Sequence, residues 1–242
     1  MFEKIKAKGY QVLGLHHAEA ILTHDMGTAI DELEAVLSDI SIPVEELVRG
    51  GGGEGELTQR IRRQLADKYE WRGHRFEVKK IVDGVVKESI SHEIDHVKAF
   101  SKGTFALEIE WNNKDPFFDR DLENFKRLHS DGVISIGAIV TRGTSLQEEM
   151  RSLIEAFARK QGLDSMAKLS AFYSPTKRQE DLILKAAKTS GSFQAGWAHA
   201  FVSDKFGEST THWRKLEERV QRGVGNPCPL LFIGIPKGVV SV

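Results

Sequence analysis

The chain has 242 residues, of which 40% are hydrophobic and 29% charged, and its net charge is −1. This composition excludes disordered and collagen-like proteins, and the chain has no run of about 18 apolar residues, so we expect no membrane span. With Cys228 as its one cysteine and no apolar stretch behind its charged start, we expect a cytoplasmic protein without an internal disulfide.

The near-neutral net charge conceals an uneven distribution. Residues 1–141 carry 19 Lys and Arg against 25 Asp and Glu, whereas residues 142–242 carry 15 against 10. Ordinary variation of surface charge would produce this asymmetry. So would an acidic, metal-binding centre in the first part and a surface facing a polyanion in the second.

Two helices are predicted in the first part of the chain. Apolar residues at helical spacing follow a Thr28-x-x-Asp31 cap and predict a helix over 28–40. A glycine-rich stretch at 50–55 has no Gly-Lys-Ser/Thr after it, so we interpret it as a surface loop and not as a phosphate-binding loop. Leucine and isoleucine spaced by four predict a second helix over 56–69.

The pattern then changes to the alternation typical of strands, at 76–81, 85–86 and 94–100. Residues 104–111 alternate most clearly. Their odd-numbered positions are apolar and would face the core, and Glu108 and Glu110 lie on the other face.

The rest of the chain alternates between helices and strands. An apolar stripe through Phe118, Leu122, Phe125 and Leu128 predicts a helix, and an apolar strand follows at 133–140. This order of strand, helix and strand is typical of a crossover unit, so the sequence predicts an α/β fold in one domain. Further elements are expected as helices at 145–160, 179–188 and 211–220 and as a buried strand at 229–235.

Two chemical patterns compete between residues 92 and 110. The first, His92-Glu93-x-x-His96, matches the H-E-x-x-H motif of zinc peptidases, in which Glu93 would be the general base. That motif requires a helix, which brings both imidazoles onto one zinc ion. Because we expect a strand here, we favour partly buried histidines, and a zinc peptidase remains an alternative.

The second pattern is acidic. With a turn made of Ser101 and Lys102 alone, Asp95 lies opposite Glu108, and two facing carboxylates repel unless a cation separates them. Oxygen ligands of this kind suit Mg²⁺. A three-residue turn that includes Gly103 would bring His96 opposite Glu108 instead. The pattern is also that of an ordinary solvated strand face.

Asp95 followed after twelve residues by Glu108-Ile109-Glu110 resembles the active-site hairpin of PD-(D/E)XK nucleases. Within that superfamily, the chain is similar to type II restriction endonucleases of the BamHI, BglII and BstYI group, which have Glu or Gln where other members have Lys. The similarity covers most of the chain loosely and is strongest over 93–141. The run 108–122 is similar to the core of the BglII type, and 222–235 is similar to the carboxyl-terminal strand of BstYI. It implies a central mixed β-sheet flanked by helices in one endonuclease domain, 1–242, with room for an insertion at about 151–200.

The resemblance implies a homodimeric, Mg²⁺-dependent type II deoxyribonuclease that cuts each strand of a short palindromic site in double-stranded DNA. Asp95, Glu108 and the backbone carbonyl of Ile109 would bind the metal. Glu110 would orient or deprotonate the attacking water, or bind a second metal through a water molecule. Glu56 would be an outer ligand, although an acid at the start of a helix is also favourable by itself.

The resemblance also indicates segments that contact DNA. Asn112 and Asn113 follow the catalytic strand and would read bases, or they are turn residues. Residues Ser209, Thr210, Thr211 and His212 are similar to a second DNA-contacting segment, or they cap a helix. Candidates for phosphate contacts, each of which is otherwise a solvated charge, are Lys114, Arg142, Arg214 and Arg222. A non-catalytic DNA-binding module with a purely structural acidic hairpin remains a third hypothesis.

Overall fold

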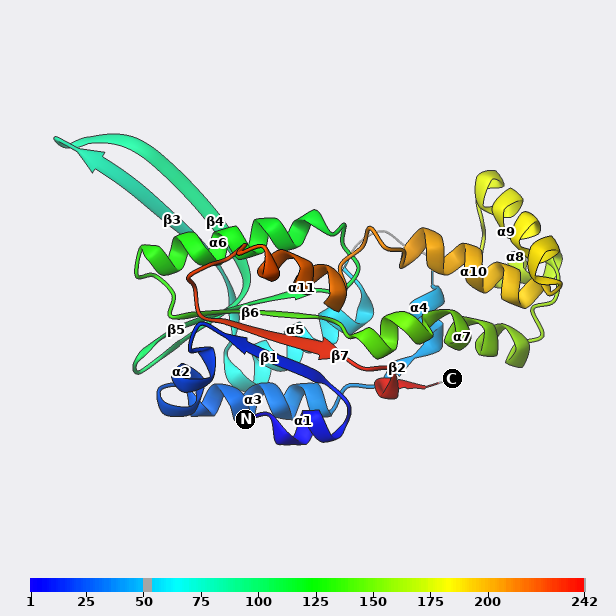
Figure 1. Cartoon of the computed structure of the whole chain (residues 1–242), viewed down its shortest axis with the longest axis horizontal. Coiled ribbons are helices and arrows are strands. Elements are labelled where there is room, and N and C mark those ends of the chain that lie inside the picture. The colour runs from blue at the N-terminus through cyan, green and yellow to red at the C-terminus, as the bar shows by residue number, and fades with distance from the viewer. Residues whose placement is uncertain (50–53, 242) are drawn as a thin grey trace.

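The computed structural model describes residues 1–49 and 54–241, so most of the predicted glycine loop lies outside the described residues. A six-stranded sheet with the order β1-β7-β6-β5-β4-β3 forms the centre of the molecule (Figure 1). Its strands are β1 (Gln11–Leu15), β3 (Arg72–Val82), β4 (Val85–Phe100), β5 (Gly103–Glu110), β6 (Ile136–Arg142) and β7 (Leu230–Ile235). Because β5, β6 and β7 are parallel and the other pairs are antiparallel, the predicted mixed α/β sheet is confirmed.

Helices cover both faces of this sheet. The helices before β3 are α1 (Glu3–Ala7), α2 (Ala18–His24), α3 (Gly27–Ser38), α4 (Val44–Val48) and α5 (Glu56–Tyr69). The later ones are α6 (Pro116–Ser130), α7 (Thr144–Lys160), α8 (Met166–Phe172), α9 (Lys177–Ser190), α10 (Phe193–Lys205), α11 (Trp213–Gln221) and the short η1 (Lys237–Val239). A separate two-stranded sheet pairs β2 (Ile42–Pro43) with β8 (Val240–Ser241). Among the described residues, no helix has the length and hydrophobicity needed to cross a bilayer.

The alternation along β5 divides the interior into two cores. Phe105, Leu107 and Ile109 pack into the core that α3 and α5 share. Ala106 packs into the opposite core, which α6 and α11 cover. Glu108 and Glu110 share the face of Ala106. Since each is only 3% exposed, the interpretation of this face as solvated is wrong.

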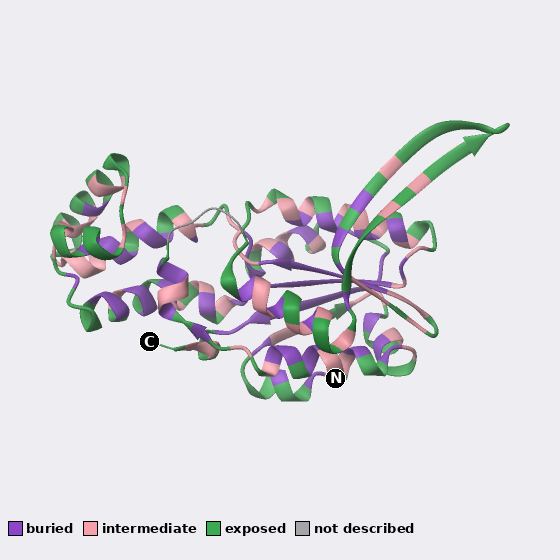
Figure 2. Ribbon diagram, turned by 180° about the vertical axis from the view of Figure 1, so that it is seen from behind, coloured by how far each residue is buried: buried purple, intermediate pink, exposed green. Residues whose placement is uncertain are grey.

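Two sequence predictions need correction at the level of local structure. The cap predicted at Thr28 does not form, because α3 begins at Gly27 and Met26 precedes it without a side-chain cap. The strands predicted at 76–81, 85–86 and 94–100 are parts of β3 and β4, which form one long hairpin that projects from the body (Figure 2). Most of the projecting part is exposed on both faces, so it lacks the regular alternation that a core imposes.

The crossover β5-α6-β6 is confirmed, and the helix packs closely on the sheet at Gly137. A Cβ atom at this position would lie 2.5 Å from Cγ of Phe125. The contact leaves no room for a side chain, and it fixes the distance between α6 and the strands beside it.

We therefore expect Gly137→Ala to lower the free energy of unfolding by about 1–3 kcal/mol, because an overpacked core forces neighbouring side chains to move. Gly27→Ala is the matched control, since a Cβ at this helix position would meet nothing within 4 Å. Urea denaturation of both variants measures the difference. Equal stability of Gly137→Ala and the unchanged protein would contradict the close packing of α6.

Candidate active site

The turn between β4 and β5 sets the geometry of the acidic residues. Phe100 pairs with Gly103, so the turn consists of residues 101 and 102, and the pairing continues back to His96 opposite Leu107. The next residues along, Asp95 and Glu108, therefore meet, and the backbone N–H of Asp95 donates a hydrogen bond to Oε2 of Glu108 at 3.3 Å. The two-residue turn is confirmed, and the alternative with a three-residue turn is wrong.

Burial changes the acidity of both glutamates on β5. Desolvation raises the pKa of Glu108 well above its usual value, and the nearby charges of Asp121 and Asp95 raise it further. Desolvation raises the pKa of Glu110 to about 8, and Asp121 adds to that effect. Carboxyl groups that are held close together and out of water, with raised pKa values, are characteristic of functional sites.

Asp121, on α6, belongs to this cluster although the sequence analysis did not select it. It is completely buried, and its Oδ1 accepts a hydrogen bond from Nε of Arg120 at 2.8 Å. Its Oδ2 is buried and accepts no hydrogen bond from an N–H group of the described residues, and the carboxyl group of Glu110 lies within hydrogen-bonding reach of Asp121. A signal was present in the sequence, because position 121 lies within the apolar stripe of Phe118 and Phe125, where a carboxylate is unexpected.

Asp95 also borders a cavity of about 830 Å³. The cavity gathers several of the predicted site residues, namely Glu56, Asp95, Ile109, Asn112 and Asn113. Glu56 lies at its edge, where Nη1 of Arg49 holds Oε1 of Glu56 at 2.7 Å. Asp95 is exposed, so the acidic pair is reachable from solvent on its Asp95 side.

These residues fit a hard cation that keeps part of its water shell. Within the described ranges, no three acidic, histidine or cysteine side chains already converge as a complete metal site. The adjacent carboxylates of Asp95 and Glu108 nevertheless supply the one or two oxygen ligands with which proteins usually hold Mg²⁺. The buried Oδ2 of Asp121, which accepts no hydrogen bond from an N–H group of the described residues, is a further oxygen that a cation or its water would satisfy.

The two candidate DNA-contacting segments lie side by side, although almost a hundred residues separate them. The backbone N–H of Asn113 donates to Oγ1 of Thr211 at 3.1 Å, and the N–H of Thr211 donates to the carbonyl of Asn113 at 2.8 Å. Lys114 and Thr210 form an isolated β-bridge. Asn113 also connects the pair to the acidic cluster, since its side-chain amide donates to Oε2 of Glu110 at 2.8 Å.

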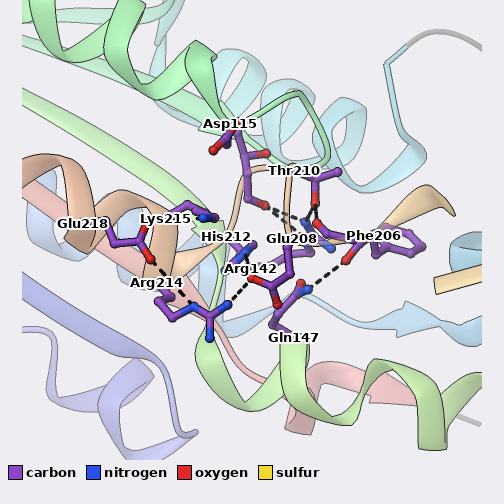
Figure 3. A network of polar contacts seen from close by, with 12 residues as sticks. Asp115, Arg142, Gln147, Phe206, Glu208, Thr210, His212, Arg214, Lys215 and Glu218 are labelled. Carbon is purple, nitrogen blue, oxygen red and sulfur yellow. Dashed lines mark hydrogen bonds and ion pairs between the residues drawn. The ribbon is translucent and has the colours of Figure 1, made fainter. Parts of the chain in front are cut away.

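Arg142 supports the second segment from inside (Figure 3). It is fully buried, and desolvation lowers its pKa to about 9. Its Nη2 donates to Oγ1 of Thr210 at 2.6 Å and to the carbonyl of Thr211 at 2.7 Å. Thr211 and His212 are buried too, whereas Ser209 is exposed. In this arrangement Arg142 has no surface to offer to a phosphate, and its role is to hold the segment.

The other candidates for contacts with DNA phosphate are on the surface. Lys114 and Arg222 are exposed, and so is Arg214, which forms an ion pair with Glu208.

His92 and His96 lie on β4, which is a strand as expected. Four residues along a strand span roughly 13 Å, so the two imidazoles cannot share one zinc ion. His96 is buried, and its Nδ1 lies 3.3 Å from the carbonyl oxygen of Leu107. The zinc-peptidase alternative is therefore wrong.

The chain matches a known protein family. The model of a family described as "Restriction endonuclease BglII/BglIII" matches residues 10–235. No curated protein matches the chain. The matched range contains β4, β5 and α6, and thus every residue of the acidic cluster.

We predict that the metal-free protein loses stability as the pH rises from about 5 to about 8. The pKa of Glu110 is about 8 in the folded protein, against a usual value of 4.5. Over this window the folded state therefore keeps a proton that the unfolded state releases, so the free energy of unfolding falls by up to about 1.4 kcal/mol per pH unit. Urea denaturation in EDTA at several pH values measures the slope.

Glu110→Gln should make this slope shallower, because it removes one of the groups with a raised pKa. Glu123→Gln is the matched control, since Glu123 lies on the surface of α6 and its ion pairs lower its pKa. Identical slopes for Glu110→Gln and the unchanged protein would contradict the burial of Glu110.

Proposed function

The chain belongs to the BglII/BglIII family of restriction endonucleases, and from that premise we propose that it is a Mg²⁺-dependent type II deoxyribonuclease that cleaves a short palindromic site. The family implies a nuclease that cuts DNA at specific sites. The observation that supports the finer proposal is the meeting of Asp95 with the buried Glu108 on one hairpin, where the Asp95 carboxyl group lies close enough to raise the pKa of Glu108. Such a pair of carboxylates is stable in the charged form only beside a cation.

Asp95, Glu108 and the backbone carbonyl of Ile109 would hold the metal. The side chain of Ile109 packs into the opposite core, so only its backbone is available to the site. When bound, Mg²⁺ polarises the scissile phosphate, lowers the pKa of a bound water and stabilises charge on the leaving 3′-oxygen. We place Glu56 outside the direct ligands, because its carboxylate is paired with Arg49.

Glu110 would orient the attacking water and accept its proton. Asn113 holds one of its carboxyl oxygens, and Nη2 of Arg120 lies 3.5 Å from the other. Burial raises the pKa of Glu110 to about 8 in the metal-free protein, so its carboxylate is a stronger base than that of a solvated glutamate. The proton leaves the water as the water oxygen bonds to phosphorus and the bond to the 3′-oxygen breaks.

Base and phosphate contacts would come from the two joined segments. Asn112, Asn113, Lys114, Ser209 and Thr210 form their outer part, and Asn side chains can read adenine through paired hydrogen bonds. Buried neighbours would fix the shape of this surface from inside; these are Arg142, Thr211 and His212.

We propose a single domain over 1–242 with 151–200 as an insertion, and we place the enzyme in the cytoplasm, where it meets DNA.

The direct test of this function is DNA cleavage. We expect the purified protein to cut phage DNA in Mg²⁺ into fragments whose sequenced ends share one short palindrome. Glu108→Ala should abolish cutting, since it removes one of the two facing carboxylates. Glu93→Ala is the matched control, because Glu93 lies on the same hairpin and is exposed.

Two outcomes would contradict the proposal in different ways. Uncut DNA with the unchanged protein would exclude the nuclease. If that protein still bound duplex DNA with an affinity that falls steeply with salt, and Glu108→Ala bound equally well, the chain would be a DNA-binding module.

A palindromic site requires one active centre for each strand, related by a two-fold axis, so we expect a homodimer. Light scattering after gel filtration should give twice the chain mass of 27.1 kDa. A complex of one chain on a duplex with the palindromic site would contradict this part of the proposal.

A further inference from the structure

Arg120 lies beside the acidic cluster, on the second turn of α6. Its Nη2 is 3.5 Å from Oε1 of Glu110 and 2.7 Å from Oδ1 of Asp121, and its Nε also bonds to Asp121. Its guanidinium carbon lies 4.4 Å from the centre of the Phe117 ring. Three groups thus fix the orientation of a side chain that is still 53% exposed.

The contacts of Arg120 leave part of its guanidinium for a ligand. Its hydrogen bonds in the described chain use Nε and Nη2, and Nη1 is not among the bonded nitrogens. A guanidinium is always charged and presents its N–H groups in a planar fork that fits both carboxylate and phosphate oxygens. The edge with Nε and Nη2 is bonded to Asp121 and Glu110. Nη1 is left to donate to a phosphodiester oxygen.

The charge balance of the site favours such a contact. The carboxyl groups of Asp95, Glu108, Glu110 and Asp121 lie near enough for charges among them to raise the pKa values of the last three, and a DNA phosphate adds a negative charge. The arginines that line the cavity among the described residues have carboxylate partners of their own, because Arg49 pairs with Glu56 and Arg62 pairs with Glu54. Arg120 is placed against the carboxyl groups themselves.

We propose that Arg120 is a catalytic residue that contacts the scissile phosphodiester and stabilises the negative charge that develops on it, and that Asp121 is the positioning residue that orients it. This inference rests on the proposed nuclease function. Asp121 is completely buried, so a carboxylate there holds the guanidinium at a fixed place. A charged donor that is oriented before the reaction stabilises the transition state more than it stabilises the bound substrate.

The test is single-turnover cleavage of a duplex with the palindromic site, together with DNA binding measured without Mg²⁺. We expect Arg120→Ala to lower the cleavage rate constant by about 100-fold, the usual effect of losing one donor to a developing oxyanion, and to change the DNA dissociation constant less than about threefold. Arg120→Lys should recover part of the rate, since it restores the charge without the fork. Added guanidinium ion should speed up Arg120→Ala and leave Glu108→Ala inactive.

Arg127→Ala is the matched control. Arg127 lies on the same helix with similar exposure, 48%, and it pairs with Glu123 away from the acidic cluster. Its substitution should leave the cleavage rate unchanged. Asp121→Asn should slow cleavage in the otherwise unchanged protein but cause no further loss in Arg120→Ala, because residues that act as one unit are not additive.

The possible outcomes distinguish a failure of the role proposed for Arg120 and Asp121 from a failure of the proposed nuclease function. Cleavage by Arg120→Ala within threefold of the unchanged protein, or equal losses in rate and in DNA binding, would overturn the role of Arg120. Full additivity of Asp121→Asn and Arg120→Ala would overturn the positioning role of Asp121. If the unchanged protein cuts no DNA, the proposed nuclease function itself fails.

Discussion

The register of one hairpin determines whether the acidic residues can act together. A turn of two residues places Asp95 against Glu108, and a slip by one residue would turn every side chain of β4 to the opposite face. Gly103 helps to set this register, because a Cβ at its position would come within 2.9 Å of Cε of Met26 and still closer to Ser135. A larger residue at this point would require the side chains of Met26 and Ser135 to move.

The acidic cluster is stable because the rest of the domain surrounds it with apolar packing. Glu108, Glu110 and Asp121 lie against the core that α6 and α11 cover, and their charged forms are disfavoured there. A protein selected for stability alone would place apolar side chains at these positions. Their burial is intelligible if a cation occupies the site, because the negative charges of the carboxylates and of a DNA phosphate then have a partner.

The sequence predicts local structure well where one periodicity dominates. Helix α5 and the crossover through α6 follow from their apolar spacing, and the strand that carries the glutamates follows from its alternation. The prediction of a solvated face on β5 is wrong because α6, which comes from another part of the chain, packs over that face. For the same reason Asp121 became a candidate only with the structure. Strand β1 pairs with β7 across more than two hundred residues, and local periodicity contains no information about such a partner.

The hydrogen bonds around Asn113 connect the two proposed DNA-contacting segments to the acidic cluster. Buried Arg142 holds the carbonyl of Thr211, Thr211 is bonded to the backbone of Asn113, and the amide of Asn113 holds Glu110. Each of these bonds is short, and every member except Asn113 is buried, so water does not compete strongly with them. Any displacement of the outer segments by DNA must therefore move Asn113 or break one of these bonds. If Glu110 faces the attacking water as proposed, its position depends on the fit of the DNA to residues some distance away, and this dependence is a physical basis for cutting at a specific site.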